Sequence, residues 1–463
     1  MLFDAAWLKQ AGLDDIQMQI NIGANLNETD DSGRTPLIYA IVFEKDAEIV
    51  RLLIKNGAKV NTETDDGHSP LIYALSVGAK PEIVELLLNS NADINVADKY
   101  GRPPLILALE HHFPPHIIQA LIKRGADVNA EYTNTAKNIH STPLLTALQN
   151  QADIATIKTL LQNEAEVNQT ADGLTPLTAA LRQNADMAVI ELLLDYGADI
   201  NRADGNGLTP LMCSFAHRNK AISMLLIDKG ADLTRPTPDN LPLLLYALAR
   251  RASLESIEYL IEHGADVKTT DKNAQTSLMF AVRNDCPPEI TALIIKYGVE
   301  VNARDNTGMT ALMFADDAAT AELLITHGAE VNARDHAGMT ALMHICEHGT
   351  TPETVNLLVA NGADVNAADN AGNTPLMFAA AAGDTEVAQA LLELSAEVNV
   401  QNTDGASPLM KAVANKAPRK LIKALLNAGA DTKARNRAGL SVLQSAEKDY
   451  PQIIELLMQN GAF

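Results

Sequence analysis

The sequence predicts an all-α solenoid with β-hairpin or turn fingers, and three observations lead to this fold class. First, an Asn that closes a GADVN-like run recurs with a period of 34 residues, as at Asn27, Asn61, Asn95 and Asn129. Second, most periods contain a Thr-Pro or Ser-Pro pair followed by apolar residues at helical spacing. Third, aromatic residues make up only 4% of the chain and hydrophobic residues 47%, which suits thin, closely stacked helices. A fixed period of this kind indicates a core built from contacts between neighbouring units.

The period continues along the whole chain. Further members of the Asn series are Asn168, Asn201, Asn302, Asn332, Asn366 and Asn399, and the remaining slots hold Thr234, Lys268 and Lys433. Residues 1–27 lack the hairpin and the Thr-Pro start, as the atypical end unit of a stacked array does. We therefore expect N-terminal capping helices in residues 1–27 and one continuous array over residues 28–463.

The first full unit, residues 28–61, shows how the residues set the structure. Thr35 is a helix N-cap, and Pro36 suits the first helical position because its missing N–H costs nothing there. A second helix begins near Ala47, and Gly57 ends it as a residue with positive φ. Between units we expect a turn or hairpin, in which an Asp that recurs once per unit bonds its own backbone, as at Asp98, Asp305, Asp335 and Asp369.

Three places depart from this regular unit. Residues 130–141 form a lengthened hairpin tip that carries Tyr132. Between residues 302 and 332 the spacing falls to 30 residues, which shortens the link between the two helices near residues 316–320. Ala274 takes a turn position that is otherwise Gly, where we expect strain.

Thirteen units of this kind, with TPLxxA and GADVN motifs, resemble the ankyrin repeat. The resemblance covers the whole chain and implies a curved right-handed solenoid with projecting hairpins and a concave groove lined by the first helices. It also implies a protein-binding role. The sequence departs from the family pattern because the His after TPL is apolar in nearly every unit, as at Ile38 and Met377, so we expect the polar bond of that His to be lost.

Charge and composition narrow the choice of partner and compartment. A net charge of −22 with a pI near 4.8 disfavours nucleic acid and membrane surfaces as partners. We interpret Cys213, Cys286 and Cys346 as buried, reduced thiols, because they are too few and too scattered for a disulfide framework. Without a secretory signal in residues 1–12 or a long apolar run, we expect a cytoplasmic protein that needs no cofactor and acts as a monomer.

We expect no catalytic site and no metal site. His111, His112 and His116 form an HHFPPH cluster, but the two prolines place them at a helix end, a loop and a helix start. We also find no Gly-rich phosphate loop, nucleophile elbow or His-Glu helix pair.

A basic strip is the first candidate for partner binding. Arg182, Arg250 and Arg283 lie at equivalent positions six residues after the Pro position, and His217 lies in a neighbouring position of the intervening unit. In ankyrin-like proteins these positions look onto the groove. One interpretation is that Arg complements the negative end of a helix dipole, and the other is contact with an acidic surface of a partner.

Aromatic residues at positions that we expect to be exposed form a second candidate set. They are Phe43, Tyr100 with Arg102, and Tyr132, and residues of these types are frequent anchors of interfaces. We therefore expect a non-enzymatic scaffold that binds a folded partner through the groove and the hairpin tips. Two narrower roles stay open: an inhibitor or immunity-type protein that blocks an enzyme or toxin, and a secreted effector that acts in a host.

Overall fold

The computed structural model describes residues 5–134, 139–216, 220–446 and 451–462. The chain divides into two compact units, Met1–Asp232 (unit 1) and Leu233–Phe463 (unit 2), and each is described by itself. None of the helices in the described ranges has both the length and the apolar character needed to cross a bilayer.

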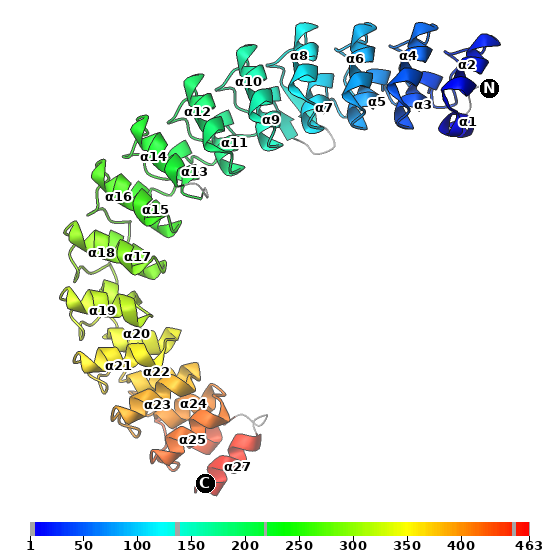
Figure 1. Cartoon of the computed structure of the whole chain (residues 1–463). Helices are drawn as coiled ribbons and strands as arrows, with labels where there is room; N and C mark the ends of the chain where they lie inside the picture. The colour runs from blue at the N-terminus through cyan, green and yellow to red at the C-terminus, as the bar shows by residue number, and fades with distance from the viewer. Residues whose placement is uncertain (1–4, 135–138, 217–219, 447–450, 463) are drawn as a thin grey trace. The chain divides into compact units, whose positions relative to one another are not determined.

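Unit 1 is a row of helix pairs, each made of a first helix and a second helix (Figure 1). The first helices are α1 (Ala5–Gln10), α3 (Pro36–Val42), α5 (Pro70–Ser76), α7 (Pro104–Glu110), α9 (Pro143–Gln149), α11 (Pro176–Arg182) and α13 (Pro210–Ser214). The second helices are α2 (Leu13–Asn21), α4 (Ala47–Lys55), α6 (Pro81–Asn89), α8 (Pro115–Lys123), α10 (Ile154–Gln162), α12 (Met187–Asp195) and α14 (Ala221–Asp228). Each first helix packs on the next first helix, and each second helix on the next second helix.

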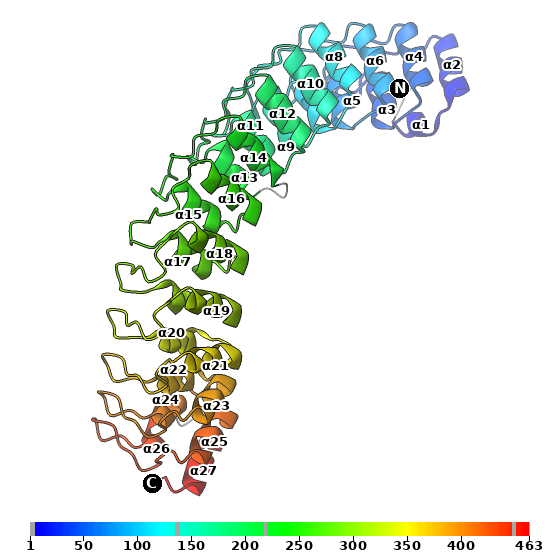
Figure 2. The same cartoon turned by 60° about the vertical axis from the view of Figure 1, so that its left-hand side comes forward.

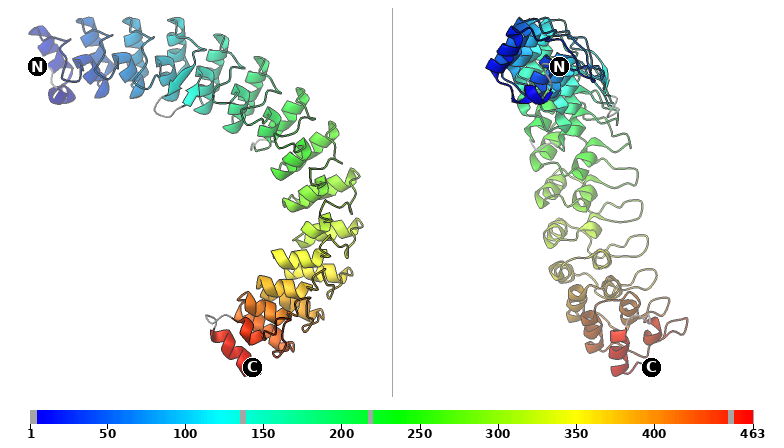
Figure 3. Two further views of the ribbon diagram at one scale, coloured as in Figure 1. Left: turned by 180° about the vertical axis from the view of Figure 1, so that it is seen from behind. Right: turned by 90° about the vertical axis from the view of Figure 1, so that its right-hand side faces the viewer.

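Unit 2 repeats this arrangement, and its turns project to one side of the helix rows (Figure 2; Figure 3, right). The first helices are α15 (Leu243–Ala249), α17 (Ser277–Arg283), the 3₁₀-helix η1 (Ala311–Phe314), α20 (Ala341–His348), α22 (Pro375–Ala382), α24 (Pro408–Ala414) and α26 (Val442–Ser445). The second helices are α16 (Leu254–Glu262), α18 (Pro288–Lys296), α19 (Ala318–Thr326), α21 (Pro352–Ala360), α23 (Thr385–Glu393), α25 (Arg419–Asn427) and α27 (Pro451–Gln459). The predicted all-α solenoid class is confirmed.

The predicted helix starts are confirmed in most units. The Ile38 N–H donates to Thr35 Oγ1 at 3.4 Å, and Pro36 is the first residue of α3. Equivalent N-cap bonds are accepted by Ser69, Thr142, Thr175, Thr209, Thr276, Ser407 and Ser441. Thr340 and Thr374 hold the same position, but their buried hydroxyls make no hydrogen bond with other described residues. Packing of the first helices therefore holds these two starts.

The turns are built on an Asp, as predicted. Asp335 Oδ1 accepts from the N–H groups of Ala337 at 2.9 Å and Met339 at 2.8 Å, and Asp98, Asp305 and Asp369 make the same pair of bonds. A Cβ added at Gly338, whose φ is +80°, would meet the backbone N of Asn370 at 2.9 Å. Glycine here thus allows successive turns to approach closely. Ala274, where we expected strain, adopts φ 61° in the corresponding position, a left-handed conformation that is unfavourable for alanine.

The Asn that marks the period connects consecutive repeats. Asn27 Nδ2 donates to the Gly57 carbonyl oxygen at 3.0 Å, and Asn27 Oδ1 accepts from the Lys59 N–H at 2.7 Å. The same pair of bonds is made by Asn61, Asn129, Asn168, Asn302, Asn332, Asn366 and Asn399. We call this pair the asparagine bridge. It explains the period, because a carboxamide carries a donor and an acceptor side by side.

The structure shows where the two units of irregular length differ from a regular unit, and the shortening expected in the link near residues 316–320 falls mainly in the first helix instead. In the long unit, β1 (Tyr132–Asn134) pairs antiparallel with β2 (Ile139–Ser141), with Tyr132 opposite Ser141. In the short unit, the first helix shrinks to η1, which has four residues where α17 has seven and α20 has eight.

Removing one asparagine bridge should weaken the stack measurably. We expect Asn332→Ala to lower the free energy of unfolding by about 1–2 kcal/mol, because it deletes two hydrogen bonds between repeats. Asn356→Ala, at an exposed position of α21, is the control and should stay within about 0.5 kcal/mol of wild type. Urea unfolding followed by circular dichroism compares them, and equal stability of the two variants would contradict the bridge.

Candidate interaction surface

The first helices bury almost all of their side chains, so little of each reaches solvent. In α11, the residues from Pro176 to Leu181 are buried and Arg182 is exposed. In α17, Phe280 is half-buried and Arg283 is exposed. We use the term first-helix face for the exposed ends of the first helices together with the turns beside them. The surface offered to a partner there consists of helix ends and turn residues.

In unit 1, Arg182 is bound within the protein. Its Nη2 donates to Asp204 Oδ2 in the next turn, and the Asp204 carboxylate is fully buried. Asp204 also accepts from the N–H groups of Asn206 at 2.9 Å and Leu208 at 3.0 Å. Arg182 therefore connects the end of α11 to the following turn while its outer surface stays exposed.

In unit 2, Arg283 is held in a similar chain of bonds. Arg283 Nη1 donates to Gln275 Oε1 at 2.9 Å, and Gln275 Nε2 donates to Asp305 Oδ2 at 3.2 Å. Burial alone would raise the pKa of Asp305, but hydrogen bonds from Thr307 and Gln275 outweigh it and hold this pKa below its ordinary value. The carboxylate therefore stays charged beside the guanidinium.

The predicted equivalence of the three arginines is wrong for Arg250. Arg182 and Arg283 are the last residues of α11 and α17, whereas Arg250 is the C-cap residue that follows α15. Arg250 lies seven residues after Leu243, the first residue of α15, whereas Arg182 and Arg283 each lie six residues after the first residue of their helix. Arg250 is exposed, and its guanidinium makes no hydrogen bond or ion pair with another described residue. His217 lies outside the described residues.

The aromatic candidates are less exposed than predicted. Phe43 is half-buried and stacks on Tyr39 with ring centroids 5.5 Å apart. Tyr100 is half-buried under the cations of Lys99 at 5.1 Å and Arg102 at 5.5 Å from its ring centroid. Both rings therefore offer an edge to a partner, and their other surfaces pack within the protein.

Tyr132 contradicts the expectation of exposure most clearly, because it is only 9% exposed. Its hydroxyl lies 3.2 Å from Thr146 Oγ1 on α9, and burial raises its pKa. The long hairpin is thus fastened to the first-helix row by the residue that we expected at its tip. The antiparallel strands alternate their side chains between two faces, and Tyr132 falls on the inner face.

Arg102 is also engaged within the fold. Its Nε and Nη2 contact Asp98 Oδ2 at 2.8 Å and 2.7 Å, and its Nη1 contacts Glu110 Oε2 at 2.6 Å. The Asp98 side chain is fully buried, and Arg102 and Glu110 are each 18% exposed. Arg102 therefore joins the turn to the end of α7.

We expected the polar bond of the His after TPL to be lost, because an apolar residue holds that position here. In several units the next residue along the chain makes a polar bond to the turn instead. Ile38 is buried as predicted, but Tyr39 Oη donates to Asp30 Oδ2 of its turn. His344 Nε2 makes the corresponding contact with Asp335 Oδ2 at 2.8 Å. Moving the polar group by one residue keeps a link between first helix and turn, so the predicted loss is wrong for these units.

A hollow opens beside the short 3₁₀-helix of unit 2, and we call it the notch. It has a volume of about 640 Å³ and lies between the ends of α17 and α20, over η1. Its floor is apolar and includes Met313, Phe314 and Ile345. Its exposed rim carries Arg283, Asp285, Asp316 and His348. The notch exists because η1 is several residues shorter than its neighbours, so it leaves the space that a full first helix would fill.

One group of potential metal ligands was not predicted from the sequence. His344, Glu347 and His348 all lie on α20 with His-x-x-Glu-His spacing, and their possible ligand atoms lie within 4.8 Å of one another. The statement that no His-Glu helix pair is present is therefore wrong. The signal was readable, since residues three and four apart share a helix face.

The other histidine cluster lies as predicted, at a helix end, a loop and a helix start. His111 is the C-cap of α7, His112 has φ 56°, and His116 is the second residue of α8. Burial lowers the pKa of His111, and His116 Nε2 lies 3.3 Å from Glu85 Oε1. The three residues therefore serve different local contacts.

The three cysteines are buried and none of them is in a disulfide, as predicted. Burial raises the pKa of Cys286 to about 11 and raises that of Cys346 as well. Both are therefore protonated, unreactive thiols at neutral pH.

The stacked helix pairs and the turns that join them place the chain in the class of helix-pair repeat proteins. A family profile described as "Ankyrin repeats (3 copies)" matches residues 2–98, 47–132, 78–171, 144–237, 243–335 and 315–402. The chain therefore belongs to the ankyrin-repeat family. Ankyrin repeats are in general protein–protein interaction modules and typically non-enzymatic.

Among solved structures, the chain is similar to the human ASB11 ankyrin repeat domain. The two share 24% sequence identity, the match covers 48% of this chain and 98% of that chain, and the TM-score is 0.44. No curated protein matches the chain.

Replacing Arg102 should destabilise α7 because it leaves the buried Asp98 carboxylate without its counter-charge. For Arg102→Met we expect a loss of about 3 kcal/mol in the local opening free energy of α7. Arg51→Met, at an exposed position of α4, is the control and should change stability by less than about 0.5 kcal/mol. Hydrogen exchange of the α7 amides measures the difference, and unchanged exchange in Arg102→Met would show that Arg102 is free for other roles.

Proposed function

We propose that this protein is a non-enzymatic scaffold that binds a folded protein partner through the first-helix face and the hairpin tips. In this proposal residues 28–463 act as one array behind the capping helices of residues 1–27, and the protein works as a monomer. Family membership supports protein binding in general, and the notch is the observation that carries the more specific statement.

The notch is suited to receive side chains of a partner. Its volume of about 640 Å³ has room for several side chains, and it combines an apolar floor with a charged rim. In the regular repeats on either side, a complete first helix fills the corresponding space. A partner that inserts a loop into the notch would therefore be held in a single register along the array.

The basic residues of the first-helix face are proposed to meet an acidic surface of the partner. Arg250 is exposed and has no described counter-charge, while Arg182 and Arg283 keep exposed surfaces beside their internal bonds. Arg283 also lies on the rim of the notch. In a chain of net charge −22, such local cations would direct an acidic partner to this face.

Two narrower roles fit the same surface. An inhibitor or immunity-type protein would cover the active site of an enzyme or toxin with the first-helix face, and a secreted effector would use this face on a host protein. We place the protein in the cytoplasm, because its three cysteines are buried thiols outside any disulfide and disulfides are characteristic of oxidising compartments. The identity of a captured partner separates these roles.

Charge reversal on the first-helix face tests the proposed binding mode. In a variant with Arg182→Glu, Arg250→Glu and Arg283→Glu, we expect the affinity for the captured partner to fall by about tenfold or more, because like charges then face the partner. Affinity is measured with the purified partner after capture from native lysate. A second variant with Gln at the same three positions separates charge repulsion from disturbance of the Asp204 pair.

The control reverses the same number of charges on exposed positions of second helices: Arg51→Glu, Lys158→Glu and Lys296→Glu. Its affinity should remain near that of wild type. Equal loss in both triple variants, or unchanged binding in the first-helix variant, would contradict binding through the basic residues of this face.

A further inference from the structure

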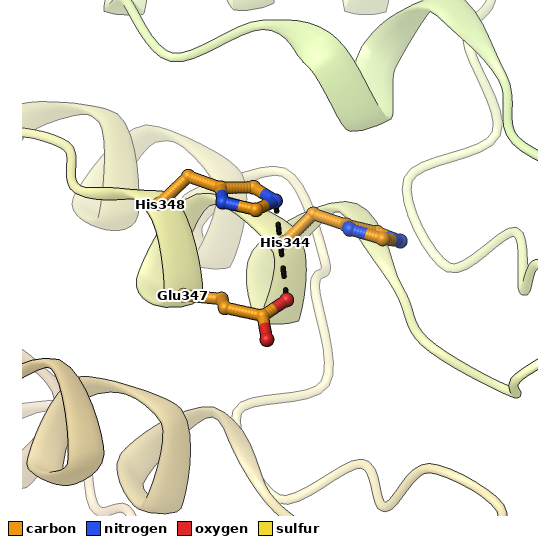
Figure 4. A group of neighbouring side chains, drawn as sticks. All are labelled: His344, Glu347 and His348. Carbon is orange, nitrogen blue, oxygen red and sulfur yellow. Dashed lines mark ion pairs between the residues drawn. The ribbon is translucent and has the colours of Figure 1, made fainter.

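Helix α20 carries three potential metal ligands, of which His344 and His348 line the notch. Figure 4 shows His344, Glu347 and His348 gathered beside one turn of the helix, with the His348 ring next to the Glu347 carboxylate. His348 Nε2 lies 3.9 Å from Glu347 Oε2, and the His344 and His348 rings are stacked with centroids 6.3 Å apart. The spacing of three and four residues places all three on one side of α20.

The hydrogen bond between His344 and Asp335 engages one ring nitrogen and leaves the other for a metal ion. Its Nε2 contacts the Asp335 carboxylate at 2.8 Å, and since a carboxylate only accepts hydrogen bonds, Nε2 carries the proton. In the neutral ring, Nδ1 then has a free lone pair. This Nδ1 is buried and has no hydrogen-bond partner among the described residues, and the residue is only 7% exposed. An orphaned buried nitrogen is costly unless a ligand satisfies it.

The contact between His344 and Asp335 is of the kind that orients a histidine ligand in a metal site. Histidine ligands almost always donate their second ring N–H to a carboxylate, a carbonyl or water, which fixes the ring and raises its basicity. Asp335 is itself fixed, because its Oδ1 accepts from the N–H groups of Ala337 and Met339. The ring of His344 is therefore oriented before any ion arrives.

The other two groups can move to complete the site. His348 and Glu347 have side chains that are 72% and 45% exposed. The ligand atoms lie within 4.8 Å of one another, and a Zn²⁺ ion that binds each of them at about 2.0–2.2 Å draws them closer together. Rotation of the two exposed side chains about a fixed His344 provides this approach.

The surroundings favour a cation with an open coordination position. His344 and His348 line the notch together with Asp285, Asp305 and Asp316, opposite the single guanidinium of Arg283. The carboxylates outnumber the guanidinium and make the local potential attractive to a divalent ion. Two imidazoles and one carboxylate match the three-ligand sites of Zn²⁺, in which the fourth position is left to water or to a group from a bound molecule.

We propose that His344, Glu347 and His348 form a binding site for a divalent transition-metal ion of the zinc class, with Asp335 as the positioning residue and the open coordination position facing the notch. This site goes beyond protein binding and does not depend on it. The chain binds one ion there, and the hard cations Mg²⁺ and Ca²⁺, which prefer oxygen ligands, do not compete.

Titration of the full-length protein with Zn²⁺ in a calorimeter tests the site. We expect one equivalent of Zn²⁺ to bind, and binding to be lost in His348→Ala and in His344→Phe. Phe occupies the position of His344 in other first helices, at Phe280, Phe314 and Phe378, so His344→Phe is expected to fold. Excess Mg²⁺ should leave the Zn²⁺ titration unchanged.

Asp335→Asn tests the positioning role. Asn402 already builds the same turn, accepting from the N–H groups of Asp404 and Ala406, so the variant keeps its fold. We expect its Zn²⁺ affinity to fall about 10- to 100-fold, which a purely structural Asp would not cause.

Control variants at histidines away from α20 complete the test. His116→Ala changes the HHFPPH cluster and His327→Ala an exposed histidine after α19, and both should bind Zn²⁺ like wild type. The proposal is overturned if wild type binds no Zn²⁺, if His344→Phe or His348→Ala binds it unchanged, or if His116→Ala alone abolishes binding.

Discussion

The asparagine bridge is the interaction that sets the spacing of consecutive repeats in most of the array. One carboxamide donates to a carbonyl oxygen and accepts from an N–H two residues further along in the next repeat, as Asn27 does with Gly57 and Lys59. Where the bridge is present, these two bonds fix the position of one repeat relative to the next at the start of the turn. The buried first helices then pack on one another, and in the first full unit the turn Asp30 and the N-cap Thr35 follow the bridging Asn27 directly.

The bridge also decides where changes of repeat length are absorbed. Asn302 keeps both bonds, to Gly328 at 2.9 Å and Glu330 at 2.8 Å, although its repeat has only 30 residues. Asn129 likewise keeps its bonds to Glu164 and Glu166 beside the lengthened hairpin. A deletion therefore shortens the first helix to η1 and opens the notch, whereas an insertion extends the hairpin into β1 and β2. Surface features arise at these two places while the repeat spacing is kept.

Elements that depend on local sequence could be predicted, and contacts between repeats could not. The Thr35-Pro36 helix start, the positive φ at Gly57 and the turn Asp residues follow from local rules, and they agree with the structure. The burial of Tyr132 against Thr146 and the ion pair between Arg182 and Asp204 depend on which side chains meet across repeats, and a single sequence does not show this. The His344-Glu347-His348 group was readable from spacing alone, but its support by Asp335 required the turn geometry.

In the proposed function, the shortened repeat shapes the surface that meets the partner, and the asparagine bridges keep the spacing of the repeats. Grafting the segment 374–384, TPLMFAAAAGD, in place of 310–317, TALMFADD, adds three residues and restores a first helix like α22. The most direct measurement is the affinity of this graft for the partner captured by wild type. We predict that binding is lost while the unfolding midpoint stays at or above that of wild type, and unchanged affinity would contradict the account.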